Sequence, residues 1–372
     1  MKIVDRGVLN PPVPRGNRSV SVCPTITPLR DGSLLATYVI GASKDDEGQT
    51  VELRRSTDGG RTWGDPSAPF STTLGGRRGS LGAGYITQLE DDHVVLASNW
   101  VDREAYPGKP LFNSETEGIL PGRILVSDSR DLGHSWTEWL PVPVSNGMGP
   151  LAATCPILKL KDGKLVLSTE VGKDYEDRSK WFQKVVYFYS SDQGRSWSKP
   201  RTTSQDPTGR IFNWDQRAGV APDGTLVTFT WTYDHDAARY ANIHRRLSRD
   251  GGETWTEPED LGFMDQPSHP AMLPDGRVVL AWVDRFSTRS IRARMAESVD
   301  APFLENTEVV LYQLGGDSGF EHYENTRELL SDLSVWTFGL PYAEGLADGN
   351  AIVVYYAGTT GALGIYWVKL AP

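Results

Sequence analysis

The feature that most constrains the fold of this 372-residue chain is an eight-residue motif that occurs four times. Its pattern is S-x-D-x-G-x-[S/T]-W, and the copies span residues 56–63, 129–136, 190–197 and 248–255. In a tight turn the aspartate accepts hydrogen bonds from nearby amides, the glycine permits a positive φ, and the tryptophan anchors the turn between sheets. Four such turns, whose aspartates lie 73, 61 and 58 residues apart, predict a repeated β-architecture.

A second repeat interleaves with the first. Apolar stretches broken by an Asp-Gly-type turn are centred near residues 31, 91, 162, 223, 275 and 348, and each predicts a β-hairpin. The pattern predicts an all-β fold: a six-bladed β-propeller of four-stranded antiparallel blades, in a single domain of residues 1–372. The last unit shows three strands, near 336–344, 350–357 and 362–369, so we expect residues 2–8 to add its outer strand and close the ring.

Composition excludes several classes of protein. A 38% apolar and 23% charged chain is typical of a folded globular protein, and a net charge of −10 argues against nucleic acid as a partner. Cys23 and Cys155 lack the spacing of a metal or redox site, and no motif predicts a cofactor or a metal. No apolar run is long enough to span a membrane, and the first residues lack an apolar leader. We therefore expect a cytoplasmic protein, with a secreted mature chain and the choice between monomer and homo-oligomer left open.

The four motifs resemble the Asp-boxes, or BNR repeats, of the sialidase (neuraminidase) superfamily of six-bladed β-propellers. The resemblance covers roughly residues 20–360. It implies a carbohydrate-active protein whose Asp-boxes lie on the face away from the active site. Asp-boxes also occur in other glycosidases, lyases and receptors, so they indicate the fold more strongly than the activity.

The candidate catalytic acids lie in loops on the face opposite the two kinds of turn, where a rigid scaffold usually displays its binding residues. The loop 43–48 contains three consecutive carboxylates, and Asp215 begins an inner strand within 213–217. The first and fourth units face each other across a six-fold ring, so Asp46 and Asp215 are predicted to flank a central pocket. Paired carboxylates are the general machinery of sugar hydrolysis. The structural alternatives are a solvated acidic loop and a strand cap.

The resemblance also implies roles for these residues. Counted from the first turn, Asp46 matches the aspartate acid/base of sialidases. Counted back from the fourth turn, Asp215 matches the glutamate that activates the tyrosine nucleophile. Tyr342 is the tyrosine nearest to the expected nucleophile, about two positions late, and Tyr323 is a second possibility.

The arginines depart from the family pattern. Sialidases clamp the carboxylate of sialic acid with three arginines, whose planar forks pair with it. The regions expected to carry the first and second, 21–25 and 230–234, contain no arginine. Arg285 is retained in the third region, and Arg18 and Arg217 are further candidates to bind an acidic or hydroxyl-rich sugar.

Aromatic residues and a histidine complete the candidate site. Trp100 and Trp214 can stack on a sugar ring, with core packing as the alternative. His269, in a Ser-His-Pro sequence at the top of the fifth inner strand, is a candidate general acid or base, or a structural histidine.

These residues predict an exo-acting glycoside hydrolase that removes a terminal, acidic sugar. In this hypothesis Asp46 protonates the leaving oxygen and Asp215 acts as the base. Two alternatives stay open: a polysaccharide lyase acting on uronic-acid chains through His269 and Tyr342, and a glycan-binding propeller without catalytic activity.

Overall fold

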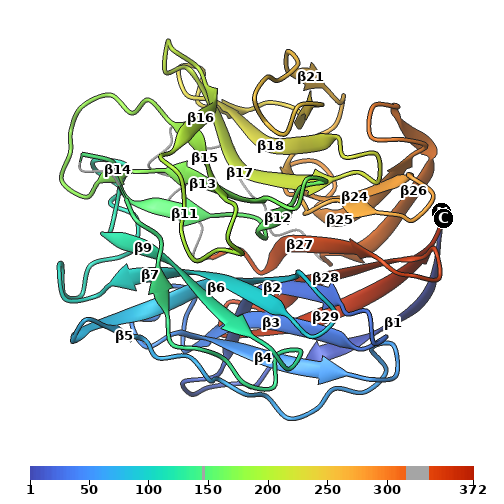
Figure 1. Cartoon of the computed structure of the whole chain (residues 1–372), viewed down its shortest axis with the longest axis horizontal. Helices are drawn as coiled ribbons and strands as arrows, with labels where there is room; N and C mark the ends of the chain where they lie inside the picture. Colours follow the sequence, from blue (N-terminus) through green and yellow to red (C-terminus); the bar gives the residue numbers. More distant parts are fainter. Residues whose placement is uncertain (145–146, 316–334) are drawn as a thin grey trace.

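The structure is a computed structural model that describes residues 1–144, 147–315 and 335–372. These residues form 29 β-strands and no helix, which confirms the all-β prediction (Figure 1). In the described part of the chain there is consequently no helix with the length and apolarity needed to cross a bilayer. The second candidate nucleophile, Tyr323, lies outside the described residues.

Antiparallel pairing sorts most of the described strands into six groups, numbered 1 to 6 here in chain order. Groups 1 to 3 contain β2 (Val20–Pro28), β3 (Leu34–Gly41) and β4 (Thr50–Ser56); β5 (Thr73–Leu74), β6 (Arg77–Gln88), β7 (Val94–Asp102), β9 (Gly122–Ser129) and β10 (Leu140–Pro141); and β11 (Leu151–Ala153), β12 (Leu158–Lys159), β13 (Leu165–Val171), β15 (Lys184–Ser190) and β16 (Arg201–Gln205).

Groups 4 to 6 contain β17 (Ile211–Val220), β18 (Leu226–Asp234), β19 (Arg239–Tyr240), β20 (His244–Ser248) and β21 (Glu259–Asp260); β22 (Gln266–Pro267), β23 (Ala271–Met272), β24 (Val278–Asp284), β25 (Ser290–Ala296) and β26 (Phe303–Gln313); and β27 (Phe338–Gly345), β28 (Ala351–Thr359), β29 (Ala362–Ala371) and β1 (Lys2–Asn10). Two short strands, β8 (Gly118–Ile119) and β14 (Lys173–Asp174), pair with each other in parallel.

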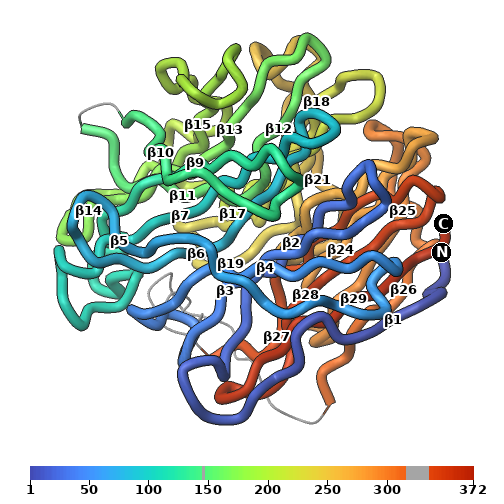
Figure 2. The backbone as a smooth tube through the Cα atoms, turned by 60° about the horizontal axis from the view of Figure 1, so that its bottom comes forward, coloured from blue at the N-terminus to red at the C-terminus, as the bar shows by residue number. Residues whose placement is uncertain are grey.

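The two ends of the chain meet in group 6. The N-terminal strand β1 pairs antiparallel with the C-terminal strand β29, and Val20 of β2 pairs with Leu363 of β29. Figure 2 shows the two termini side by side at one edge of the molecule. The first and last groups are therefore neighbours although they are farthest apart in sequence.

The six predicted hairpins are confirmed by the strand pairing. Each turn lies between two antiparallel strands: β2 and β3, β6 and β7, β12 and β13, β17 and β18, β23 and β24, or β27 and β28. In the first of them, Asp31 accepts the Ser33 N–H at 2.9 Å, and Asp348 accepts the Asn350 N–H at 3.0 Å in the last. The second strand of each hairpin is buried nearly throughout, as in β18, because it packs between neighbouring sheets.

The four repeated motifs follow β4, β9, β15 and β20 and form the same turn each time. Asp192 accepts the hydroxyl of Ser190 at 2.8 Å and the N–H and hydroxyl of Ser196 at 2.9 and 2.6 Å, and the other copies repeat this pattern. Because Ser56 of β4 pairs with Leu34 of β3, these turns lie at the same end of the strands as the hairpin turns.

These turns predict an acid-sensitive contribution to stability. The hydroxyl and N–H donors four residues on lower the pKa of Asp192 from 3.8 to about 2. A carboxyl whose pKa is lowered by folding stabilises the protein above its unfolded value of 3.8, and this stabilisation is lost as the pH falls through about 2. Asp192→Asn should therefore lower the urea midpoint at pH 7 more than at pH 2, by a small amount because the carboxylate is exposed to solvent. The exposed Asp65→Asn is the control, and an equal effect of Asp192→Asn at both pH values would contradict the assignment.

Candidate active site

A cavity of about 360 Å³ lies where strands from different groups converge. Its walls include parts of β2 from group 1, β6 from group 2, β17 from group 4 and β27 from group 6. Group 3 contributes parts of β11 and β13. On β17 the lining residues are Trp214, Asp215 and Arg217, whereas the hairpin turn follows Val220 at the other end. The cavity therefore lies at the strand ends away from both kinds of turn.

In each group the first strand of the hairpin, which we call the inner strand, departs from regular pairing at the end nearer the cavity. In β2, β6, β17 and β27 a shift of register coincides with a residue of positive φ, namely Cys23 (51°), Ala83 (52°), Asp215 (48°) and Leu340 (45°). All four line the cavity. In groups 3 and 5 the corresponding strand is split, into β11 and β12 and into β22 and β23. Such bulges turn side chains out of the sheet, and each non-glycine residue at positive φ costs about 1–3 kcal/mol.

Asp215 is the acid that one of these bulges turns toward the cavity. Its carboxylate pairs with Arg217 Nη2 at 2.7 Å and accepts a hydrogen bond from Gln266 Nε2 at 2.5 Å. Arg217 is 4% exposed and also donates to the Tyr85 hydroxyl at 3.3 Å and to the backbone oxygen of Thr154. Burial by itself would lower the pKa of Arg217, but Asp215 and Tyr85 raise it, so the guanidinium stays charged. The structure thus places Asp215 and Arg217 in one site, while their roles in chemistry stay predictions.

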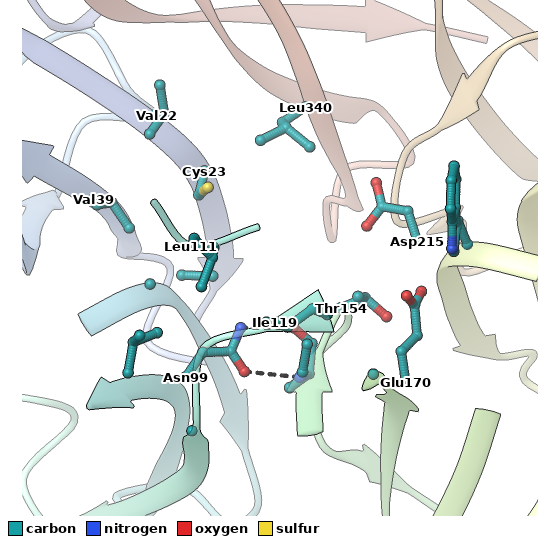
Figure 3. A pocket seen from close by; sticks show the side chains of 18 of the residues that line it. Val22, Cys23, Val39, Asn99, Leu111, Ile119, Thr154, Glu170, Asp215 and Leu340 are labelled. Carbon is teal, nitrogen blue, oxygen red and sulfur yellow. Dashed lines mark hydrogen bonds between the residues drawn. The ribbon is translucent and has the colours of Figure 1, made fainter. Parts of the chain in front are cut away.

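Glu170, near the end of β13, is a second acid lining the cavity, and the sequence analysis did not single it out. Burial and the negative charge of Asp215 raise the pKa of Glu170 to about 8, although Oε1 accepts the Gln216 N–H at 3.0 Å. Figure 3 shows the side chains of Glu170 and Asp215 pointing into the same cavity. The available sequence signal was a carboxylate in a hairpin strand that contains no other charged residue.

Asp46 lies outside the residues that line the cavity. Its carboxylate accepts the backbone N–H groups of Ala42 at 2.6 Å and Gly48 at 2.8 Å, so it stabilises its own loop. Lys44 of the same loop lines the cavity instead, and its Nζ lies 3.0 Å from the Tyr356 hydroxyl. The acid/base role of Asp46 stays a prediction that the shape of the cavity does not support.

The other two carboxylates of that loop hold a segment over the cavity, residues 103–121, which we call the cover. Asp45 pairs with Arg103 at 2.6 Å and accepts the Leu111 N–H at 2.6 Å, and Glu47 accepts the Gly108 N–H at 2.8 Å. The cover residues that line the cavity are Leu111, Phe112, Ile119 and Leu120. The acidic loop therefore acts on the site through the cover.

The far side of the cover is bound to groups 3 and 4. The Tyr175 hydroxyl donates to the Pro110 oxygen at 3.0 Å, β8 of the cover pairs with β14, and Glu117 Oε1 lies 3.1 Å from His235 Nε2. The hydrogen bond to Glu117 raises the pKa of His235, against the opposing effect of burial. Contacts to groups 1, 3 and 4 thus fix the cover, four of whose residues line the cavity.

Tyr342 lines the cavity, but its hydroxyl and its ring contact two residues that do not line it, Glu344 and His269. Its hydroxyl donates to Glu344 Oε1 at 3.3 Å, and its ring stacks on His269 with centroids 4.7 Å apart. Burial, and then the charge of Glu344, raises the pKa of Tyr342 well above its ordinary value. His269 is 6% exposed, has Nε2 at 3.4 Å from Glu344 Oε1, and is not among the lining residues.

Two of the three candidate arginines lie outside the cavity lining. Arg18 forms a two-pronged pair with Glu52, one contact of which measures 2.8 Å. Arg285 pairs with Asp265 at 3.1 Å, donates to Gln266 Oε1 at 2.5 Å and lies over the ring of Trp336 at 3.9 Å. Arg285 therefore contacts Gln266, which in turn contacts Asp215. The guanidinium of Arg285 acts on the site through Gln266 and does not line the cavity itself.

Both candidate tryptophans line the cavity. Trp100 donates its indole N–H to the Thr72 oxygen at 2.8 Å. Trp214 stacks on Tyr233 with centroids 5.0 Å apart, and Trp181 and Trp231, which also line the cavity, lie within about 6 Å of it. Aromatic faces therefore surround the segment that carries Asp215. Within the described residues no cluster of three or more His, Cys, Asp or Glu side chains is placed to hold a metal ion.

Comparison with known proteins identifies the fold. No family model matches the chain, and no curated protein matches it. A crystal structure of a protein of unknown function from Dyadobacter fermentans is similar at 22% identity, over 99% of this chain and 98% of that one, with a TM-score of 0.75. The intramolecular trans-sialidase of Ruminococcus gnavus (13% identity, 100% and 98% coverage, TM-score 0.66) and the α-L-arabinanase of Penicillium chrysogenum (15%, 100% and 98%, TM-score 0.65) are also similar. The chain has a sialidase-like β-propeller fold.

The Arg285–Asp265 pair predicts a large loss of stability on its disruption. The two side chains are 1% and 0% exposed, and burial raises the pKa of Asp265 to about 6 even though Arg285 opposes this. Removing one partner of a buried pair leaves an uncompensated charge, so Arg285→Met should lower the free energy of unfolding by about 3–5 kcal/mol. Urea unfolding measures this, with Arg30→Met in the exposed pair with Asp91 as the control. Adding Asp265→Asn to Arg285→Met should recover part of the loss, and a loss no larger than that of the control would contradict the prediction.

Proposed function

We propose that the chain is a glycoside hydrolase that removes a terminal sugar, built as a single-domain, six-bladed propeller of residues 1–372. In this reading the six strand groups are the blades, β1 closes the ring, and the four aspartate turns are Asp-boxes. The observation that carries the proposed activity is a cavity containing two acids in unlike environments. Burial raises the pKa of Glu170 to about 8, whereas Asp215 is paired with Arg217. Sugar hydrolysis uses a pair of carboxyl groups, one of which donates a proton to the leaving oxygen.

Glu170 is the proposed general acid. At neutral pH a carboxyl with a pKa of about 8 carries a proton that it can donate to the leaving glycosidic oxygen. Asp215 is the proposed base: its carboxylate takes the proton of the attacking water and stabilises the positive charge that develops on the sugar. Arg217 and Gln266 fix the orientation of Asp215, so little reorganisation is needed during the reaction.

This assignment replaces the mechanism expected from the sequence. Tyr342 donates to Glu344, and its raised pKa keeps the hydroxyl protonated, which weakens it as a nucleophile. His269, which a lyase mechanism needs in the cavity, lies behind Tyr342. The hydrolase is therefore favoured over the lyase.

The cover and the positions of the candidate arginines support a substrate with a terminal sugar that is not held by three arginines. We propose that the cover, four of whose residues line the cavity, limits access to it, which suits removal of an end residue from a chain. Arg217 is the one of the three candidate arginines that lines the cavity, and it is paired with Asp215. We propose that Lys44 and Arg217 bind hydroxyls of the sugar while the tryptophans near Asp215 stack on its ring.

A panel of 4-nitrophenyl glycosides, covering neutral sugars, sialic acid and uronic acids, tests the activity. Release of 4-nitrophenol from one glycoside is the expected result. Products absorbing near 235 nm from uronate polymers would instead identify a lyase. Binding of a glycan without turnover would identify a lectin-like propeller.

Variants of the acids give the matched prediction. Glu170→Gln and Asp215→Asn should each lower kcat by about 10²–10⁴-fold, the usual contribution of a general acid or base. Asp46→Asn should leave kcat near the wild-type value, because Asp46 is outside the lining and asparagine retains one acceptor for its loop. A large loss in Asp46→Asn with normal turnover in Glu170→Gln would restore the assignment made from the sequence.

The pH profile supplies an independent prediction. Glu170 must be protonated to donate, so kcat/KM should fall as the pH rises through about 8. In Glu170→Gln this alkaline limb should disappear from the residual activity. An alkaline limb that persists in Glu170→Gln would assign it to another group.

A further inference from the structure

The cavity has a polar end and an apolar end. In Figure 3 the side chains of Glu170 and Asp215 lie on one side, and Val22, Val39 and Leu111 lie on the other. Residues that are well separated in one view are separated in space, so a bound molecule that fills the cavity meets two different surfaces. The hydroxyls of a sugar find hydrogen-bonding partners in Glu170 and Asp215 and none in Val22, Val39 and Leu111.

The apolar end is built from the cover and from two valines of group 1, while Thr25, Lys44 and Gln49 of the same group are polar lining residues. Leu111, Phe112 and Ile119 of the cover are only partly buried and line the cavity, whereas Val22 and Val39 facing it are 5% and 2% exposed. Large apolar side chains that remain partly exposed inside a cavity favour an apolar ligand, because burying their surface releases water.

Asn99, which also lines the cavity on this side, is engaged by the backbone. Its side-chain amide donates to the Ala153 oxygen at 3.0 Å and accepts the Ala153 N–H at 2.8 Å. A sugar hydroxyl placed beside Leu111, Phe112 and Ile119 would lose its hydrogen bonds to water without gaining any from these three side chains, which is costly. The apolar end therefore discriminates against a second sugar residue.

The position of the sugar follows from the aromatic residues. Trp214 directly precedes Asp215, and the ring centroids of Trp181 and Trp231 lie 6.0 and 6.1 Å from that of Trp214, so three of the four lining tryptophans gather at the acid end. With the sugar there and the glycosidic oxygen beside Glu170, the group beyond that oxygen extends toward the cover. The geometry points to an apolar aglycone, an alkyl or aryl group, as the leaving group. This inference rests on the proposed glycosidase function and names its substrate class.

Calorimetry with the Glu170→Gln variant tests the inference without turnover. The probes are the methyl, hexyl and phenyl glycosides of whichever sugar the 4-nitrophenyl panel identifies, together with a disaccharide carrying that sugar at its end. Affinity should rise by about fourfold for each methylene that becomes buried, so the hexyl glycoside should bind at least tenfold more tightly than the methyl glycoside. Equal affinity for the two, or tighter binding of the disaccharide, would overturn the inference.

A cover variant locates the binding. Phe112→Ser should reduce the preference for hexyl over methyl while leaving the affinity for the methyl glycoside unchanged, because the acid end is intact. Phe182→Ser is the matched control, since Phe182 is 47% exposed and outside the cavity lining. An unchanged preference in Phe112→Ser would place the apolar group elsewhere and overturn the assignment to the cover.

Failure of the proposed function remains distinguishable from failure of this inference. If no glycoside is hydrolysed, the same calorimetry is performed on the wild type with 4-nitrophenol alone. Binding that Phe112→Ser weakens and Phe182→Ser does not would uphold an apolar site while the glycosidase is rejected. Absence of such binding would overturn the apolar site as well.

Discussion

The site depends on the inner strands giving up regular pairing at the level of the cavity. A continuous strand would send alternate side chains to the two faces of its own sheet, where they pack against neighbouring sheets, and few of them would point into the cavity. The bulge at Asp215, with its φ of 48°, redirects one carboxyl group, and Cys23, Ala83 and Leu340 mark the same departure in other groups. Regular pairing on both sides of the bulge, as between β17 and β18, stabilises the strained conformation of the residue at positive φ.

One buried cation organises the charges that these bulges bring together. Arg217 pairs with Asp215 and contacts Tyr85, so the negative charge of Asp215 is compensated inside the protein. Burial and the charge of Asp215 raise the pKa of Glu170 and favour its neutral form, although Arg217 opposes them. The two acids therefore differ in their contacts, since Arg217 pairs directly with Asp215, and Arg285 holds Gln266 against the same carboxylate.

The repeats allowed the hairpins and the general position of Asp215 to be predicted, because their turn residues act within a few positions of each other. Several inner-strand interruptions also left a local signal, since Cys23, Cys155, His269 and Leu340 each precede a proline, which cannot donate to a ladder. Glu170 was missed because the property that marks it, burial beside Asp215, depends on two groups that meet only in three dimensions. The role of the acidic loop 43–48 could not be predicted from its sequence, because its carboxylates bind backbone amides of the loop itself and of the cover, and the cover is distant in sequence.

The distribution of parts among the groups separates chemistry from recognition. The acids come from β13 and β17, whereas the apolar wall comes from the cover and from group 1, with Asp45 and Arg103 joining these two. In the proposed glycosidase, substitutions in the cover should thus change the leaving group that fits without altering the environment of Glu170. In a site that held its substrate by an arginine clamp, the same cations would act on both the substrate and the catalytic carboxyls. In the proposed glycosidase, Arg18 and Arg285 are engaged elsewhere, so shape and apolar surface decide which leaving group fits.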